Sequence, residues 1–188
     1  MGLNMVIERL ANEPKTLSDN WTLPPEDAKL LYLLAVSAGS KCILEIGTSI
    51  GFSTLHLAQA AKVHGGMVTT IDVSAERQEQ AKQNMKDAGL DGLVQFRLGS
   101  ALPELEKLIQ EKGTASFDFM FLDAHKAEYI DYFKAAKTLL KSNGLLFADN
   151  TQSHRREMED FIVAIKADAD WETADIGTSN GFILARKK

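Results

Sequence analysis

Three ionisable residues follow one another closely where a short apolar segment ends. The segment FDFMFLD (117–123) ends in Asp123, and His125 and Lys126 come within the next three positions. A strand in a protein core needs no charge at its tip, because charged side chains are seldom buried without a partner. An acid, an imidazole and an amine at this spacing can bind a cation and transfer protons, so we expect a functional site at this strand end.

A second set of oxygen ligands follows the next apolar segment along the chain. GLLFAD (144–149) ends in Asp149, and Asn150 comes directly after it. Two carboxylates and an amide oxygen form an all-oxygen set that suits a hard divalent cation such as Mg²⁺. We therefore predict that Asp123, Asp149 and Asn150 bind a metal ion. The alternative is structural, since acids at strand ends commonly cap helices and Lys126 would then be an ordinary solvated residue.

The segment LEIGTSIGFST contains a glycine turn between a predicted strand and a predicted helix. Gly47 and Gly51 flank the turn and let the backbone approach a ligand closely. The spacing is neither that of a dinucleotide-binding motif nor that of a phosphate loop. Glu45 precedes the turn and would repel a pyrophosphate, so it favours a cationic or hydroxyl-rich ligand. A purely structural turn is the alternative.

Asp72, in IDVSAERQ, lies a little over roughly 20 residues after the start of the glycine turn. Nucleoside-binding α/β folds often place an acid at this distance, where it binds ribose hydroxyls. Asp72 or Ser74 would otherwise cap the following helix. We favour ribose binding, because the spacing and the position at a strand end agree. Together with Glu45, Asp123 and Asp149, this acid is expected to face one crevice at the carboxyl ends of the strands.

These residues belong to a regular alternation of apolar strands and amphipathic helices. The predicted strands are 42–46, 67–72, 93–98, 117–123 and 144–149. The predicted helices are roughly 25–38, 52–63, 75–88, 102–112, 127–141 and 154–168. Continuous apolar strands between helices indicate a parallel sheet with helices on both faces. WETADIG and GFILARK flank the turn-rich link 178–181, so we expect an antiparallel hairpin at the sheet edge.

Length and composition indicate one domain, 1–188, in which 1–20 is a short N-terminal arm. The net charge of −5 and the pI of about 5.4 oppose a general attraction to nucleic acid or anionic membrane, although a local patch would still bind RNA.

Cys42 is the single cysteine, which excludes an internal disulfide, and we expect it in the core. The N-terminus lacks a signal-peptide pattern and no apolar run reaches membrane-spanning length, so we expect a cytoplasmic protein.

The same segments, in the same order, make the chain resemble a known enzyme family. LEIGTSIGFSTLHLA, IDVSAERQEQAKQNMKDAGL, the run from FDFMFLDAHKAEY to GLLFADN and the terminal GFILARK are similar to S-adenosylmethionine-dependent O-methyltransferases, above all to the caffeoyl-CoA and catechol O-methyltransferase-like family. The resemblance covers roughly residues 22–188. It implies an α/β fold with a Rossmann-like, seven-stranded class I methyltransferase sheet, mostly parallel with an antiparallel C-terminal hairpin strand, and with helices on both faces.

The resemblance also implies a role for each residue that matches a family motif. The cofactor S-adenosylmethionine would contact Glu45, Gly47, Thr48, Ser49, Gly51, Ser53, Asp72, Val73, Ser100, Ala101, Asp123 and His125. The metal would bind two neighbouring hydroxyls of the acceptor, and Lys126 would take the proton with Asp123 beside it. His125 stands where many relatives have an acid. It would contact cofactor or substrate, replace a carboxylate near the metal, or be a solvated loop residue.

The activity that the resemblance implies is methyl transfer to a hydroxyl of a small catechol-like or phenolic acceptor, by an enzyme that forms a homodimer. Methylation of a hydroxylated tRNA base is an alternative within the family, which the acidic net charge opposes. A non-catalytic cofactor-binding protein is a third alternative. Such a protein would have no use for Asp123, Lys126, Asp149 and Asn150 together.

Two departures from the family bear on the acceptor. The arm ahead of Trp21 is shorter than in relatives, and the longer insertion after Asn150 is absent. A short lid implies an open site, for a bulky acceptor or one completed by a second subunit. His154, Arg155 and Arg156 form a basic cluster near the rim, which is either a solvated helix start or a contact for an anionic substrate.

Overall fold

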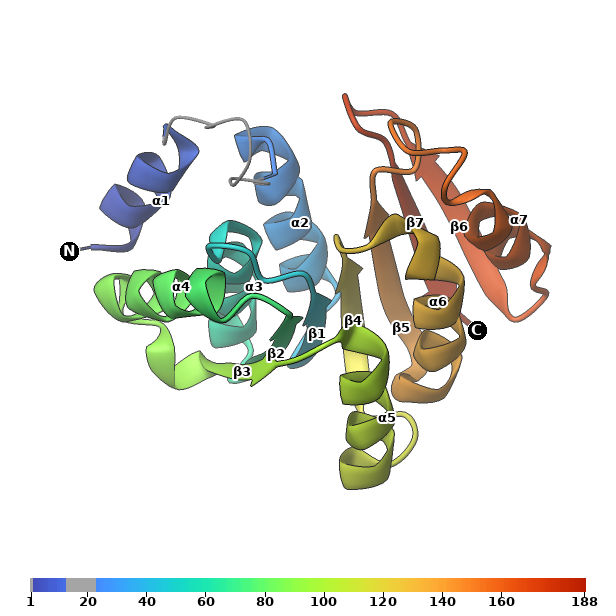
Figure 1. Ribbon diagram of the computed structural model, residues 1–188, viewed down its shortest axis with the longest axis horizontal. Helices are drawn as coiled ribbons and strands as arrows, with labels where there is room; N and C mark the ends of the chain where they lie inside the picture. The colour runs from blue at the N-terminus through green and yellow to red at the C-terminus, as the bar shows by residue number, and fades with distance from the viewer. Residues whose placement is uncertain (1, 13–22) are drawn as a thin grey trace.

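Seven strands form one sheet that separates two layers of helices (Figure 1). The computed structural model describes residues 2–12 and 23–188, so part of the predicted arm and Trp21 lie outside the described residues. The strands are β1 (Cys42–Ile46), β2 (Met67–Asp72), β3 (Val94–Leu98), β4 (Phe117–Leu122), β5 (Leu140–Asp149), β6 (Trp171–Ile176) and β7 (Phe182–Lys187). The helices are α1 (Leu3–Ala11), α2 (Pro25–Ser37), α3 (Phe52–Val63), α4 (Ala75–Ala88), α5 (Ala101–Lys112), α6 (Tyr129–Leu139) and α7 (Glu159–Ala167), with short 3-10 helices η1 (Asp91–Leu93) and η2 (Lys126–Glu128).

The strand order in the sheet is β3-β2-β1-β4-β5-β7-β6. The strands from β1 to β5 pair in parallel, whereas β7 runs antiparallel to both β5 and β6. The predicted parallel sheet with a C-terminal hairpin is therefore confirmed. The chain order reverses at β1, whose neighbours are β2 and β4, and ligands of such sheets bind outside the carboxyl ends of the strands at that point.

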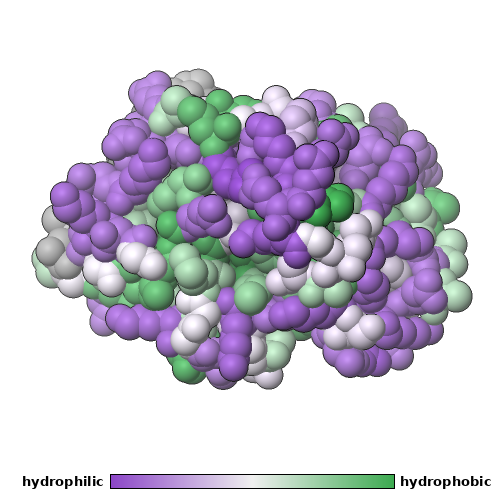
Figure 2. Space-filling view, turned by 90° about the horizontal axis from the view of Figure 1, so that it is seen from below, coloured by the Kyte–Doolittle hydropathy of each residue, from purple (hydrophilic) through white to green (hydrophobic). Residues whose placement is uncertain are grey.

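Hydrophilic residues (purple) cover most of the face drawn in Figure 2, and hydrophobic residues (green) show between them in small patches. The large hydrophobic residues that are exposed come from different elements: Met5, Leu33, Val63, Met67, Val73, Leu98 and Val163. Among the helices of the described residues, none is long and apolar enough to cross a bilayer.

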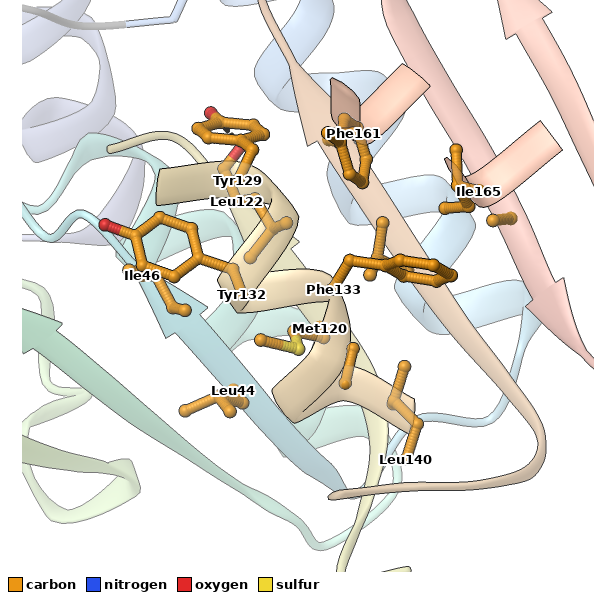
Figure 3. Packing of buried hydrophobic residues seen from close by; sticks show 14 of the residues in the cluster. Leu44, Ile46, Met120, Leu122, Tyr129, Tyr132, Phe133, Leu140, Phe161 and Ile165 are labelled. Carbon is orange, nitrogen blue, oxygen red and sulfur yellow. Dashed lines mark hydrogen bonds between the residues drawn. The ribbon is translucent and has the colours of Figure 1, made fainter. Parts of the chain in front are cut away.

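Strand β4 shows why the central strands are apolar without interruption. Met120 and Leu122 pack with α5, α6 and α7 on one face of the sheet, whereas Phe121 packs with α2 and α3 on the other. Successive side chains of a strand point to opposite faces, so a strand covered on both faces must be apolar at each position. Figure 3 shows the first face, where Phe133 of α6 lies beside Phe161 of α7 with ring centroids 6.1 Å apart. Burying such a ring stabilises the fold by about 2 kcal/mol.

The predicted N-terminal arm contains a helix, α1, that the sequence reasoning did not anticipate. Val6 and Leu10, one helical turn apart, are buried against the layer of α3 and α4. Arg9 donates a hydrogen bond to Oδ1 of Asn84, in α4, at 2.6 Å. A helix this short is marginal in isolation, so α1 depends on the packing of its apolar stripe.

Two further expectations are corrected. The helix predicted at 154–168 begins only at Glu159. Residues 151–158 form turns instead, and the first of these bond to the β6–β7 link, as the Thr151 N–H does to the Gly181 carbonyl at 3.0 Å. Cys42 is exposed rather than in the core, since it is the first residue of β1 and stands where that strand enters the sheet.

Candidate functional site

A pocket of about 640 Å³ opens at the carboxyl ends of β1, β2 and β4. Its volume is typical of sites for small ligands, and it lies where the chain order of the sheet reverses. The predicted site residues that line it are Gly47, Thr48, Ser49, Ser53, Asp72, Val73, Ser100, Ala101, Asp123, His125 and Lys126. The predicted site residues that do not line it are Glu45, Gly51, Asp149 and Asn150.

Gly47 allows the ends of β1 and β4 to approach each other closely. Its φ is +101°, and a Cβ there would lie 1.9 Å from the carbonyl oxygen of Asp123. A side chain would therefore push the two strand ends apart. Gly51, with a φ of +88°, instead lets α3 pack on α4, since a Cβ there would lie 3.0 Å from the Cβ of Ala81. The structure thus places the first glycine at the pocket and the second at a helix contact.

Asp72 and Ser49 form one wall of the pocket. The N–H groups of Ser49 and Ser74 donate to Oδ2 and Oδ1 of Asp72, each at 2.8 Å. Ser74 caps α4, because its hydroxyl accepts the Arg77 N–H at 3.3 Å. The Ser49 hydroxyl is buried and has no hydrogen-bond partner within the described chain. A buried polar atom of this kind fits a site that a bound ligand completes.

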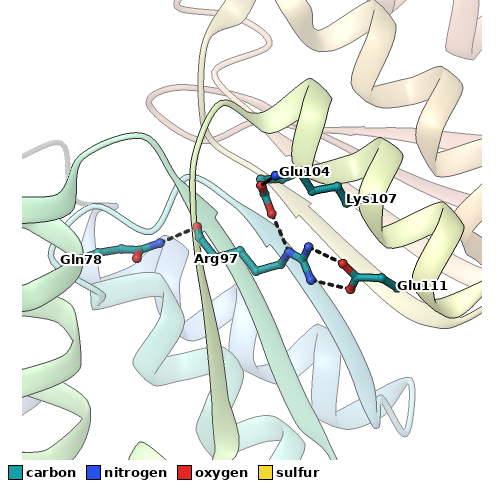
Figure 4. Close-up of polar contacts among 5 residues, drawn as sticks. All are labelled: Gln78, Arg97, Glu104, Lys107 and Glu111. Atoms are coloured by element: carbon teal, nitrogen blue, oxygen red, sulfur yellow. Dashed lines mark hydrogen bonds and ion pairs between the residues drawn. The ribbon is translucent and has the colours of Figure 1, made fainter.

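The loop between β3 and α5, which lines the pocket at Gly99, is held by a charged network (Figure 4). Arg97 Nε donates to Glu104 Oε2 at 2.7 Å, and both terminal nitrogens of Arg97 donate to Glu111. Gln78 of α4 donates to the Arg97 carbonyl at 2.6 Å. These bonds join β3 to α4 and to α5, so the loop is held from two sides.

Glu45 lies fully buried behind the pocket wall rather than in it. The hydroxyls of Ser53, Thr54 and Thr70 each donate to its carboxylate at 2.6 Å. Burial raises the pKa of Glu45 to about 7, although the three hydroxyls act to lower it. Ser53 does line the pocket, so Glu45 reaches a ligand only through its neighbours.

Lys126 and Asp123 form a partly buried ion pair in the pocket. Lys126 Nζ donates to Asp123 Oδ1 at 2.9 Å and to the Tyr129 hydroxyl at 3.3 Å. The Tyr129 hydroxyl donates to the Leu122 carbonyl at 3.1 Å. Burial, and then the charges of Asp123 and Asp149, raise the pKa of Tyr129 well above its usual value. Tyr129 therefore stays neutral and helps to hold the lysine in place.

Asp149 lies beside Asp123 but is buried, with 2% of its surface exposed. The pairing of Leu122 with Ala148 brings the two acids to neighbouring strand ends. Oδ1 of Asp149 accepts the N–H of Asn150 at 2.6 Å. Burial, and then the charge of Asp123, raise the pKa of Asp149 to about 8.

The chemistry of the predicted metal ligands fits a cation. The charge of Asp123 raises the pKa of the neighbouring Asp149 carboxyl, and a divalent cation between them would favour the ionised form of both. Asn150 adds an amide oxygen and adopts a left-handed backbone, with φ +69°, which asparagine tolerates. Across residues 2–12 and 23–188, no group of three or more His, Cys, Asp or Glu side chains is placed to hold a metal ion.

His125 lines the pocket with 72% of its side chain exposed, and its Nδ1 lies 3.7 Å from Glu128 Oε1. Several lining residues were not predicted, including Leu23, Phe52, Gly99, Tyr132 and Glu157, whereas His154 belongs to the basic cluster expected near the rim. His154 and Glu157 come from the turns that the sequence reasoning assigned to a helix. Phe52 and Tyr132 follow helical apolar spacing, which indicates burial but does not say which cavity a side chain borders.

Comparisons with known proteins agree with this geometry. The chain matches the O-methyltransferase family over residues 4–188. It is 37% identical to a catechol O-methyltransferase of Niastella koreensis over 129 residues, which are 69% of this chain and 58% of that protein. It is 31% identical to caffeoyl-CoA O-methyltransferase 1 of Zea mays over 185 residues, 88% of this chain and 71% of that protein. The chain thus spans less than two thirds of the length of the first of these relatives.

A solved structure shows the same likeness in three dimensions. The O-methyltransferase of Bacillus cereus, in complex with SAH, superposes with a TM-score of 0.86 at 29% identity. The superposition covers 99% of this chain and 90% of that one. The similarity therefore extends over the pocket and over both helix layers.

Proposed function

Since the chain belongs to the O-methyltransferase family and has the class I methyltransferase fold, we propose that it transfers a methyl group from S-adenosylmethionine to a hydroxyl of a small catechol-like or phenolic acceptor, with a divalent cation. The catechol and caffeoyl-CoA relatives support the acceptor class, and the SAH in the Bacillus cereus structure supports the methyl donor. The observation that carries the proposal is the ion pair of Lys126 with Asp123 in the pocket, beside the buried Asp149.

The methyl donor is assigned to the part of the pocket around the glycine turn. Asp72 would accept hydrogen bonds from ribose hydroxyls, because its carboxylate keeps lone pairs beyond the two that accept backbone N–H groups. Val73, with 70% of its surface exposed, would offer apolar contact to the adenine. Ser49 and Ser53 would lie along the amino-acid part, where the unpartnered Ser49 hydroxyl supports a ligand contact.

Asp123, Asp149 and Asn150 would hold the cation, and Lys126 would act on the acceptor. A bound divalent cation lowers the pKa of an acceptor hydroxyl and fixes its orientation. Lys126 is largely shielded from water, and with the cation bound its Nζ would take the hydroxyl proton of the acceptor. The oxygen–carbon bond forms as the carbon–sulfur bond of the donor breaks, and the released proton remains on Lys126.

The test is methyl transfer by the Asp149→Ala variant, with and without EDTA, to catechols, phenolic acyl-CoA esters and tRNA that carries a hydroxylated base. We expect transfer to be abolished by the substitution and by EDTA, while affinity for SAH, measured by calorimetry, stays close to that of the wild type. Asp131→Ala is the matched control, since Asp131 is an exposed acid of α6 paired with Lys134. Turnover that survives both EDTA and the loss of Asp149 would overturn the metal-dependent mechanism.

The acceptor panel also decides between small molecules and RNA. Arg155 and Arg156 are exposed next to His154, which lines the pocket, and this cluster favours an anionic acceptor. Methylation of tRNA with an affinity that falls steeply with salt would replace the small-molecule assignment. Methylation of a catechol that is insensitive to salt would support it.

A further inference from the structure

Helix α1 is joined to the glycine turn of the pocket through one buried side chain of α4, that of Asn84. Figure 1 shows α1 beside α4 at the same end of the sheet. Arg9 Nη2 donates to Asn84 Oδ1 at 2.6 Å, and Asn84 Nδ2 donates to the Ile50 carbonyl at 2.8 Å. Since Ile50 directly follows Ser49, which lines the pocket, the two bonds connect the N-terminal helix to the wall of the cofactor site.

The two partners of Asn84 allow its amide only one orientation. The guanidinium group of Arg9 only donates hydrogen bonds and a backbone carbonyl only accepts them, whereas the amide has one end of each kind. A flipped amide would break both bonds and leave buried polar atoms without partners, which is unfavourable. Arg9 therefore holds Asn84 in the orientation that the Ile50 carbonyl requires.

The glycine turn needs this support because part of its backbone is strained. Ser49 has a φ of +46°, in the left-handed region that residues other than glycine seldom adopt. Such a conformation persists only where the surrounding contacts hold it. Asp72 holds the turn from β2 by accepting the Ser49 N–H at 2.8 Å, and Asn84 holds the Ile50 carbonyl from α4. The buried Ser49 hydroxyl, which has no partner within the described chain, belongs to the residue that these two bonds flank.

We propose that Arg9 and Asn84 are positioning residues for the cofactor site, and that the docking of α1 is coupled through them to the binding of S-adenosylmethionine. Helix α1 docks through its apolar stripe, Val6 and Leu10, and through the bond from Arg9. A docked α1 keeps the turn in the form that binds the cofactor, and a bound cofactor keeps the turn in the form that binds α1, because coupling between two sites is reciprocal. The inference rests on S-adenosylmethionine as the cofactor, and it is independent of the cation and of the acceptor.

The first experiment measures the affinity for SAH by calorimetry, in EDTA and without an acceptor. Arg9→Met keeps the apolar stem of the side chain and removes its donors, so the Kd of SAH should rise by about 5- to 20-fold, the lower part of the range for coupled sites. Arg9→Lys keeps a donor and should restore much of the affinity.

Asp87→Asn is the matched control for the Arg9 variants. Asp87 is a second group near Arg9, at 3.9 Å, and its own hydrogen bond comes from Gln83 of the same helix. A pair this long at the surface contributes little, so the Kd of SAH should stay within about twofold of that of the wild type.

The second experiment follows hydrogen exchange of the backbone N–H groups of α1 with and without SAH. In the wild type, SAH should slow this exchange by about 5- to 20-fold, since the coupling acts in both directions. Asn84→Asp has nearly the same shape and keeps an acceptor for Arg9, but it has no donor for the Ile50 carbonyl. This variant should weaken SAH at least as much as Arg9→Met does, while exchange in α1 stays slow and no longer responds to SAH.

The outcomes distinguish the inference from the proposed function. Unchanged SAH affinity in Arg9→Met, or exchange in α1 that SAH does not alter in the wild type, would overturn the inference. An equal loss of affinity in Asp87→Asn would show an effect of charge rather than of the two bonds, and would overturn it as well. A wild-type protein that does not bind SAH would remove the cofactor assignment itself, and the inference with it. A failure of methyl transfer with this coupling intact would overturn only the proposed metal and acceptor.

Discussion

Glu45 and Asp149 are two buried acids at the carboxyl edge of one sheet, and they differ in the hydrogen-bond donors and the charges around them. Burial raises the pKa of Glu45 to about 7 and that of Asp149 to about 8. Glu45 accepts hydrogen bonds from three hydroxyls, which come from α3 and β2. Asp149 accepts the backbone N–H of Asn150 and lies near a second carboxylate, Asp123.

The comparison shows that a buried acid is not by itself a sign of a metal ligand. The neighbours of Glu45 supply donors, so this carboxylate orients other groups without an added cation. The charged neighbour with the largest effect on the pKa of Asp149 is Asp123, which has the same sign, and a cation would relieve the repulsion. We therefore assign the region of Glu45 to recognition of the cofactor and the region of Asp149 to the chemistry.

The largest effect is expected at the second region, for Lys126→Met. Methionine keeps the apolar stem of the side chain but takes no proton, so turnover should fall by about 10²- to 10⁴-fold. Affinity for SAH should remain close to that of the wild type, because Lys126 is assigned to the acceptor. Steady-state kinetics and calorimetry measure the two quantities. Unchanged turnover would break the assignment of this region to catalysis.

The next largest effect is on stability: the contribution of Glu45 to the unfolding free energy should fall as the pH rises. The folded pKa of about 7 lies above the ordinary 4.5, so between these pH values the folded state binds more protons than the unfolded state. The stabilising contribution of the proton is complete below pH 4.5 and is lost as the pH rises to 7. Relative to Glu45→Gln, the wild type should lose about 3 kcal/mol of unfolding free energy across this window. Urea denaturation at pH 5 and pH 8 measures the difference, and parallel pH profiles would contradict the prediction.

Magnesium should stabilise the protein through the region of Asp149 and not through the region of Glu45. At about 100 times its Kd, Mg²⁺ should raise the unfolding free energy of the wild type and of Glu45→Gln by about 3 kcal/mol. Asp149→Asn should show little of this gain, because it loses a charged ligand. Thermal unfolding with Mg²⁺ and with EDTA provides the measurement. An equal response in Asp149→Asn would place the cation elsewhere.

The smallest effect is expected for His125→Ala. The side chain is mostly exposed and its contact with Glu128 is long, and exposed pairs contribute up to about 1 kcal/mol. The value of kcat/KM should therefore change by no more than about fivefold. A larger loss would show that His125 contacts cofactor or substrate, and would extend the catalytic region to the start of η2.

Much of the fold could be predicted because strands and helices leave local patterns in the sequence. The ranges predicted for β1 and β2, 42–46 and 67–72, coincide with the observed strands, since each is a short run rich in residues that favour strands and ends near a turn. Helix α1 was missed, and the start of α7 was misplaced. The first depends on contacts with α4, and the second follows turns whose first residues bond to the β6–β7 link, both distant in sequence.

The sequence by itself determined the alternation of strands and helices and the kinds of residue that stand at the strand ends, because hydrophobic period and turn chemistry are local properties. Only the tertiary structure decided which of these acids meets the pocket. Glu45 precedes Ile46, the last residue of β1, and side chains alternate along a strand, so Glu45 points to the face where Ser53 and Thr54 enclose it. Asp72, at the end of β2, reaches the pocket instead. The direction and the partners of each acid depend on strand register and on distant residues, which no local pattern records.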